Sequence, residues 1–112
     1  MIVVMPNGRA QKNDRPEGNI YAAAPAFANF ERDLLDDVIP AIASRYEVVK
    51  TPEGRALAGL SMGGGQTLNF GLSHLDTFAW IGAFSPAPNS KAPGEVLPKP
   101  DEAKKHLKLF VL

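Results

Sequence analysis

The most informative part of this chain is the stretch Arg55-Ala56-Leu57-Ala58-Gly59-Leu60-Ser61-Met62-Gly63. Its first six residues form a short apolar run typical of a buried β-strand, and the residues from Gln66 to His74 indicate a helix. Between them, residues 59–63 fit the pattern G-x-S-x-G, in which a serine occupies a sharp turn from strand to helix. Small residues two positions before and after the serine let the two backbones approach closely. The stretch therefore predicts a turn that lifts the Ser61 hydroxyl above a sheet.

Three more apolar runs are typical of strands. They are Met1–Met5, which Pro6 closes, Phe78–Phe84 and Leu107–Leu112. Continuous apolar runs of this kind occur in strands that are buried on both faces, as in a parallel sheet. The four runs together predict the strands of one sheet.

An amphipathic helix is predicted after the first of these strands. Apolar residues recur every four positions, at Phe30, Leu34, Val38, Ile42 and Tyr46. Asn29 is the expected N-cap. Pro40 interrupts the pattern, and by itself it indicates either a kink or the first turn of a second helix. One or two further helical turns are expected at Asp101–His106.

The alternation of strands and helices predicts an α/β fold with a mostly parallel sheet and helices on both faces. Functional sites in such sheets lie at the carboxyl ends of the strands. Two long irregular segments, residues 7–28 and 85–100, each follow a strand, as does the turn at Ser61. Loops of this length are usually functional or disordered. We therefore expect one cleft, which these three segments surround.

The composition argues against several classes of function. The chain has 112 residues, of which 45% are hydrophobic, as in one ordinary packed domain. Its twelve basic residues balance twelve acidic ones, and no basic block occurs, so no nucleic-acid partner is expected. No apolar run reaches the roughly 18 to 20 residues of a membrane helix, so no membrane partner is expected. The chain has no cysteine, and hence no disulfide or thiolate metal site.

No cofactor or metal is expected either. No lysine follows the glycines at residues 63–65, as a phosphate-binding loop requires, and Leu68 stands where a dinucleotide-binding turn has a glycine. Four acidic residues on the predicted helix are more simply its solvated face than a metal cluster. They are Glu31, Asp33, Asp36 and Asp37.

A serine nucleophile needs a histidine base and a carboxylate that orients it. The two histidines are His74 and His106. His74 lies about thirteen residues along the predicted helix, roughly 20 Å from Ser61 at 1.5 Å per residue, and His106 precedes the last strand, at the wrong edge of the sheet. Asp76 and Asp101 also precede strands. The chain is therefore expected to carry a nucleophile without its catalytic partners.

Several stretches resemble the esterase D-like α/β-hydrolases, and among these the carbohydrate esterases of the feruloyl and acetyl-xylan esterase type. The resemblance rests on Ile2-Val3-Val4-Met5-Pro6-Asn7, on Phe30–Leu35 with Ile39-Pro40, and on residues 55–65, and it extends to Asn69, Leu75-Asp76 and Phe78. It implies a serine esterase in which Ser61 is the nucleophile and the Met62 backbone N–H is one oxyanion donor. Because Pro40 has a counterpart in the family's helix, the resemblance favours a continued or mildly kinked helix.

The resemblance also implies that residues 1–112 are the central part of one α/β-hydrolase domain. The second oxyanion donor would come from a loop after an earlier strand, upstream of Met1, the catalytic acid from residues after Leu112, and the histidine from beyond one further strand. The family's strand order places another strand between Met1–Met5 and the strand at Arg55. We therefore expect the N-terminal strands and the segments with the acid and the histidine to lie outside this chain, as in a truncated or partial reading frame.

The function implied is that of a serine carboxylic-ester hydrolase that cleaves acyl esters linked to carbohydrate through an acyl-enzyme at Ser61. Small-molecule or polysaccharide esters are the expected partners, with Tyr21, Phe27 or Phe30 against an aromatic acyl group. Two alternatives remain open, an acyltransferase on the same fold and a catalytically inactive truncated product. The 112 residues alone are expected to be inactive, and the family's habit suggests secretion.

Overall fold

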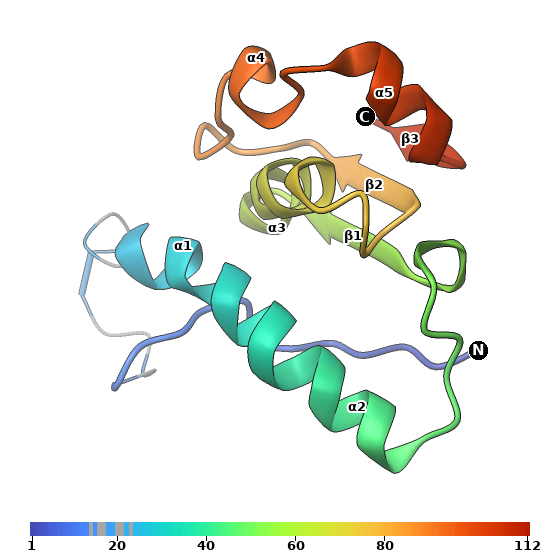
Figure 1. The fold of residues 1–112 in the computed structure, drawn as a ribbon. Coiled ribbons are helices and arrows are strands. Elements are labelled where there is room, and N and C mark those ends of the chain that lie inside the picture. Colours follow the sequence, from blue (N-terminus) through green and yellow to red (C-terminus); the bar gives the residue numbers. More distant parts are fainter. Residues whose placement is uncertain (14, 16–17, 20–21, 23) are drawn as a thin grey trace. The chain divides into compact units, whose positions relative to one another are not determined.

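The computed structural model describes residues 1–13, 15, 18–19, 22 and 24–112. The chain forms two compact units, Met1–Ile42 and Ala43–Leu112. The first unit holds most of a helical stretch that consists of α1 (Ala24–Arg32), the π-helical segment η2 (Asp33–Val38) and α2 (Ile39–Arg45). The second unit holds the sheet and the turn at Ser61 (Figure 1).

The sheet has three strands in the order β1-β2-β3, all parallel. They are β1 (Ala56–Leu60), β2 (Trp80–Phe84) and β3 (Leu109–Val111). Helical segments precede the first strand and connect the others. These are η3 (Pro52–Gly54) before β1, α3 (Met62–Gln66) with the π-helical η4 (Thr67–Gly71) between β1 and β2, and α4 (Pro93–Val96) and α5 (Pro100–His106) between β2 and β3. This architecture confirms the predicted α/β class with a parallel sheet.

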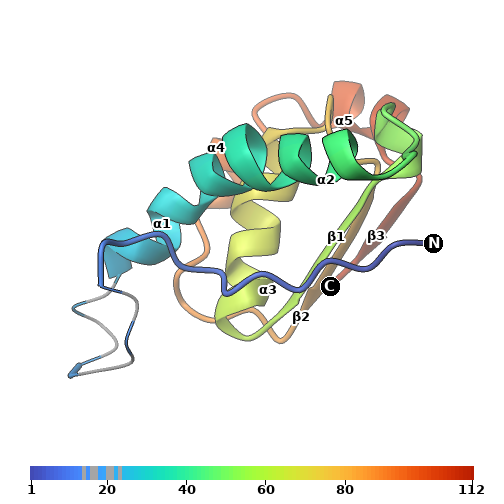
Figure 2. The ribbon, with the colours of Figure 1, turned by 90° about the horizontal axis from the view of Figure 1, so that it is seen from below.

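One face of the sheet forms the core of this unit, as α3 and η4 lie against it (Figure 2). Ile81 and Ala83 of β2 point to this face and are fully buried, and Phe70 of η4 is 3% exposed. The opposite face carries exposed apolar residues, including Leu60, Trp80 and Phe84. Residues 43–112 form no helix that covers this second face. The expectation that helices cover both faces of the sheet therefore stays a prediction.

The strand predicted at Met1–Met5 is wrong for the structure described. These five residues have irregular backbone and are exposed. A strand exists only through hydrogen bonds to a neighbouring strand. In the described part of the chain β1 pairs only with β2, so Met1–Met5 is not hydrogen-bonded to the free edge of β1 as a further strand of the sheet. The apolar pattern is that of a strand, but the described residues provide no partner for it.

The long helix begins at Ala24, so the predicted N-cap at Asn29 is wrong and Asn29 lies inside α1. Pro25 suits the first turn, because proline has no N–H to leave unpaired there. The predicted stripe is confirmed at Phe30 and Leu34, which are 6% and 7% exposed.

Helical backbone runs through Pro40, which is the second residue of α2. The segment directly before it is π-helical, and the N–H of Ile39 donates to the carbonyl of Leu34, five residues back. A proline ring clashes with the carbonyl one turn earlier in an α-helix, and a wide π-helical turn relieves such crowding. The continued helix that the resemblance favoured is thus the form observed.

Other predicted boundaries shift by a few residues. The helix after Ser61 begins at Met62 instead of Gln66, and α4 lies unpredicted within the proline-rich segment 85–100. Three consecutive glycines at 63–65 disfavour a helix by propensity. Tertiary packing overrides that propensity here, because Gly64 and Gly65 are both buried.

Candidate active site

Ser61 lies at the turn between β1 and α3 with φ 55° and ψ −115°. An L-residue rarely adopts this backbone conformation, which costs about 1–3 kcal/mol and persists only where the surroundings impose it. Ser61 itself is exposed. The structure therefore places the serine of G-x-S-x-G on a strained turn at the carboxyl end of a strand.

The close approach of strand and helix depends on Gly59. A Cβ atom there would collide with the carbonyl group of Gly63 and would lie 2.8 Å from the Thr67 hydroxyl oxygen. By contrast, a Cβ on Gly63 would meet nothing within 4 Å in the described part of the chain. The prediction that both positions require a small residue thus holds for position 59. Gly63 contributes its backbone carbonyl group to the contact, and its own position leaves room for a side chain.

The neighbouring strand β2, the segment after it and α3 all hold the Ser61 backbone. The Ser61 N–H donates to the carbonyl of Phe84 at 3.0 Å, and the Ser61 carbonyl accepts from the N–H of Ala87 at 2.9 Å and from that of Gly65 at 3.1 Å. Between Phe84 and Ala87 lies Ser85, whose φ is also positive, at 43°. The beginning of the segment 85–100 therefore lies beside Ser61, as expected for a segment that borders the site.

These bonds set the direction of the Met62 N–H. A trans peptide is planar, so its N–H points away from its C=O. Because the Ser61 carbonyl is directed to Ala87 and Gly65, the Met62 N–H points to the opposite side. As the first N–H of a helix, it has no intrahelical acceptor. The turn thus leaves a backbone N–H without an intrahelical acceptor directly after the exposed Ser61.

Two asparagines tie the segment after β2 to the helix after Ser61. Asn89 Nδ2 donates to the carbonyl of Met62 at 3.2 Å. Asn69 Nδ2 donates to the carbonyl of Asn89 at 2.9 Å, and Asn69 Oδ1 accepts from the N–H of Lys91 at 2.8 Å. Asn89 Oδ1 is buried and has no hydrogen-bond partner in the described part of the chain. An unsatisfied buried acceptor of this kind costs about 1–3 kcal/mol.

Neither histidine lies at the Ser61 edge of the sheet. His74 precedes β2 and His106 precedes β3, whereas Ser61 follows β1. Because the strands are parallel, these positions lie at opposite edges, and at about 3.3 Å per residue the five residues of β2 separate the edges by roughly 13 Å. This placement agrees with the prediction that neither histidine is the base.

Three of the acidic residues considered earlier have local partners. Asp76 accepts from the Thr77 hydroxyl at 3.3 Å, and Asp101 pairs with Lys104 at 3.2 Å. On the long helix, Asp36 pairs with Arg32 at 3.5 Å. The described residues contain no group of three or more side chains arranged to hold a metal ion. None of the described helices is both long enough and apolar enough to cross a membrane.

The aromatic residues proposed for an acyl group all belong to the first unit. Tyr21 lies outside the described residues. Phe30 is only 6% exposed, because its side chain belongs to the buried face of α1. The expectation that Phe30 contacts substrate is therefore wrong, and Phe27, which is partly buried, stays a prediction.

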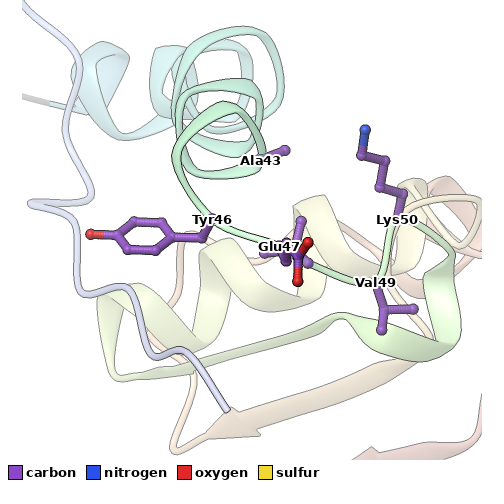
Figure 3. Close-up of a pocket in the computed structure, with 6 residues that line it drawn as sticks. Ala43, Tyr46, Glu47, Val49 and Lys50 are labelled. Carbon is purple, nitrogen blue, oxygen red and sulfur yellow. The ribbon is translucent and has the colours of Figure 1, made fainter.

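A pocket of about 520 Å³ lies at the end of α2 and along the chain that leads to η3. One continuous segment lines it, with Tyr46 directed away from Lys50 (Figure 3). Its lining residues are Ala43, Tyr46, Glu47, Val48, Val49 and Lys50. None of them belongs to the turn at Ser61, so this pocket is not part of the candidate site.

Sequence reasoning missed Phe84, Ala87 and Asn89 as parts of the site. Ala87 and Asn89 follow a strand, as candidate residues do, but a single sequence does not show that they reach back to Ser61 and Met62. Asn69 was noted only for its place in the resemblance, without a role.

Comparison with known proteins agrees with this geometry. Residues 1–105 match the family model described as "Putative esterase". The chain is also similar to the solved structure of a CE1 ferulic acid esterase from the anaerobic fungus Anaeromyces mucronatus, with 28% sequence identity and a TM-score of 0.58. That match covers 74% of this chain and 29% of the fungal chain, so residues 1–112 span less than a third of its length. On the family match, which includes nearly the whole chain, this protein belongs to the esterase family.

Proposed function

We propose that this protein is a serine esterase that cleaves acyl groups from carbohydrate, of the feruloyl or acetyl-xylan type. The observation that carries the proposal is the backbone of Ser61, with φ 55° at the carboxyl end of β1 and α3 directly behind it. This is the strand–turn–helix context of a nucleophile elbow. Membership of the esterase family and the likeness to a ferulic acid esterase support ester hydrolysis.

In the proposed reaction, the Ser61 hydroxyl oxygen attacks the ester carbonyl carbon as a base takes its proton. The resulting oxyanion accepts a hydrogen bond from the Met62 N–H and from a second donor. As the tetrahedral intermediate collapses, the bond from the carbonyl carbon to the sugar oxygen breaks, the protonated base gives its proton to that oxygen, and the acyl group stays on Ser61. Water then attacks the acyl-enzyme with the help of the same base, which releases the carboxylic acid and restores the Ser61 hydroxyl. A single oxyanion donor typically contributes about 10²–10³ in kcat.

The base, the acid and the second donor are proposed to come from residues outside 1–112, so that this chain is the central part of one α/β-hydrolase domain. Two observations support this. The described residues bring no histidine to the Ser61 edge of the sheet, and the match to the fungal esterase covers 29% of that chain. Residues 1–112 alone are accordingly proposed to be inactive.

Labelling with a fluorophosphonate tests the nucleophile. The complete gene product should be labelled, the Ser61→Ala variant should not, and the Ser85→Ala variant should be labelled as in the wild type. Ser85 is a matched control, because it also has positive φ and also follows a strand. Labelling that survives in Ser61→Ala, or a wild type that is never labelled, would overturn the assignment.

Substrate class is tested by release of ferulic acid from a feruloylated arabinoxylan oligosaccharide and of acetate from acetylated xylan. Release of either acid, lost in Ser61→Ala, is the expected result. Transfer of the acyl group to an added sugar in preference to water would instead identify an acyltransferase.

A further inference from the structure

We propose that Asn89 is a positioning residue that keeps the Met62 N–H directed at the oxyanion. This inference rests on the proposed function, since it assigns a role in the same reaction. Asn89 lies 27 residues after Met62, in the segment that follows β2. Its side chain reaches back to the turn and not toward solvent.

The segment that follows β2 reaches the peptides on both sides of the Met62 Cα atom, and the Gly65 N–H of α3 also bonds the first of them. The peptide before its Cα atom is fixed where the Ser61 carbonyl accepts from the Ala87 N–H. The peptide after its Cα atom is fixed where the Met62 carbonyl accepts from Asn89 Nδ2. With both peptide planes anchored, neither dihedral angle of Met62 can change without breaking one of these bonds. The Met62 N–H lies in the first of these planes, opposite the Ser61 carbonyl, and the anchored second plane restrains rotation of the first about the bonds to the Met62 Cα atom.

Asn89 is itself held in place. Its carbonyl accepts from Asn69 Nδ2 in η4, and its side-chain oxygen lies so close to Gly65 that a Cβ atom there would collide with it. The amide must turn its nitrogen to the Met62 carbonyl, and its oxygen then has no partner in the described part of the chain. In this orientation the Asn89 side chain donates to the Met62 carbonyl, while its own Oδ1 atom has no hydrogen-bond partner in the described part of the chain.

An oxyanion donor acts mainly on the transition state, so a misdirected donor lowers kcat more than it changes KM. In the complete gene product, the variant Asn89→Leu keeps the approximate size of the side chain and loses the donor. We expect its kcat to fall by about tenfold or more, with KM within about threefold of wild type. The inhibition constant of an aryl boronic acid, whose serine adduct carries a tetrahedral anion, should rise by a similar factor.

The variant Asn89→Asp provides a readout that a purely structural role would not alter. An ionised carboxylate cannot donate to the Met62 carbonyl, whereas a protonated carboxyl group can. The ratio of its kcat to that of the wild type, measured at the same pH, should therefore rise as the pH falls through the pKa of the introduced carboxyl group. Asn29→Asp, an exposed change on α1, is the matched control and should leave the ratio constant and near one.

Failure of the inference is distinct from failure of the proposed function. If Ser61→Ala abolishes labelling but both Asn89 variants have wild-type kcat and boronate inhibition, Asn89 is not a positioning residue. A pH-independent ratio for Asn89→Asp, or a loss of kcat matched by an equal loss of titratable active sites, would equally overturn the inference. Retained labelling in Ser61→Ala would instead contradict the proposed function.

Discussion

Gly59 and Gly63 are in contact across the turn at Ser61, with no room for a Cβ atom on Gly59 against the Gly63 carbonyl group. This contact brings the end of β1 against the start of α3. The Thr67 hydroxyl oxygen lies on the same side, 2.8 Å from where that Cβ would be. The conformation of Ser61 therefore depends on the absence of a side chain two residues before it.

Gly59→Ala is expected to destabilise the complete protein by about 1–3 kcal/mol or more, because backbone has to move to admit the methyl group. Fluorophosphonate labelling of Ser61 should slow as the turn is displaced. Denaturant unfolding and the labelling rate measure the two effects.

The control for this substitution is Gly63→Ala, where the described residues leave open space. Because alanine favours a helix over glycine by roughly 0.5–1 kcal/mol, the stability of this variant should be unchanged or slightly higher. A loss of stability as large as that of Gly59→Ala would contradict the asymmetry between the two positions.

Gly65→Ala is expected to displace the Asn89 side chain, whose Oδ1 atom occupies the space that the methyl group would need. The bond from Asn89 Nδ2 to the Met62 carbonyl would then be lost. We expect a fall in kcat similar to that of Asn89→Leu, and little further fall when the two substitutions are combined. Independent, multiplying effects in this double-mutant cycle would show that the two residues do not act through one contact.

Ile81 is fully buried at the centre of β2, opposite Leu57 of β1 and Phe110 of β3. Its truncation leaves a cavity in the core beneath η4. Ile81→Val should cost about 0.5–1.5 kcal/mol and Ile81→Ala about 2–5 kcal/mol, as measured by denaturant unfolding. If both variants unfold like the wild type, the core is not centred on this residue.

The pKa of Glu53 is lowered from 4.5, first by a hydrogen bond to its own backbone and then by one from the Thr51 side chain, with weaker help from the charges of Lys108 and His106. Because the folded pKa lies below the unfolded value, the carboxylate stabilises the fold above about pH 4.5, and this contribution is lost as the pH falls through the lowered pKa. Glu53→Gln should remove that part of the acid dependence.

An NMR titration of the Glu53 carboxyl group measures the shift directly. Thr51→Val removes one of its two hydrogen bonds, so the pKa should rise toward 4.5 in this variant. An unchanged pKa in Thr51→Val would mean that the hydroxyl does not contribute.

The polypeptide of residues 1–112 alone is expected to hydrolyse a simple aryl ester no faster than its Ser61→Ala variant, since no described histidine lies at the Ser61 edge of the sheet. Initial rates of the two purified polypeptides make the comparison. Turnover above the Ser61→Ala level would show that the chain supplies its own base.

Local patterns were sufficient to predict much of this structure. The apolar run before Ser61, the turn and the helix after it are contiguous, and a strand–turn–helix of this kind is encoded within about a dozen residues. The stripe at Phe30 and Leu34 likewise follows from periodicity alone. The placement of His74 away from Ser61 followed from the rise of a helix, and that of His106 from the direction of parallel strands.

The errors arose where structure depends on distant partners. Met1–Met5 has the composition of a strand, yet the described chain provides no neighbouring strand to pair with it. The start of the long helix at Ala24 was missed because the apolar stripe begins only at Phe30, whereas the first turn extends to Pro25.

The sequence by itself determined the parallel α/β arrangement and the position of Ser61 on a turn, because periodicity and small residues act over short distances along the chain. Only the tertiary structure decided how that turn is held. The bonds that fix Met62 come from Ala87 and Asn89, and the latter lies 27 residues away. Such contacts form when β2 pairs with β1 and carries the following segment past Ser61, a relation that no local pattern encodes.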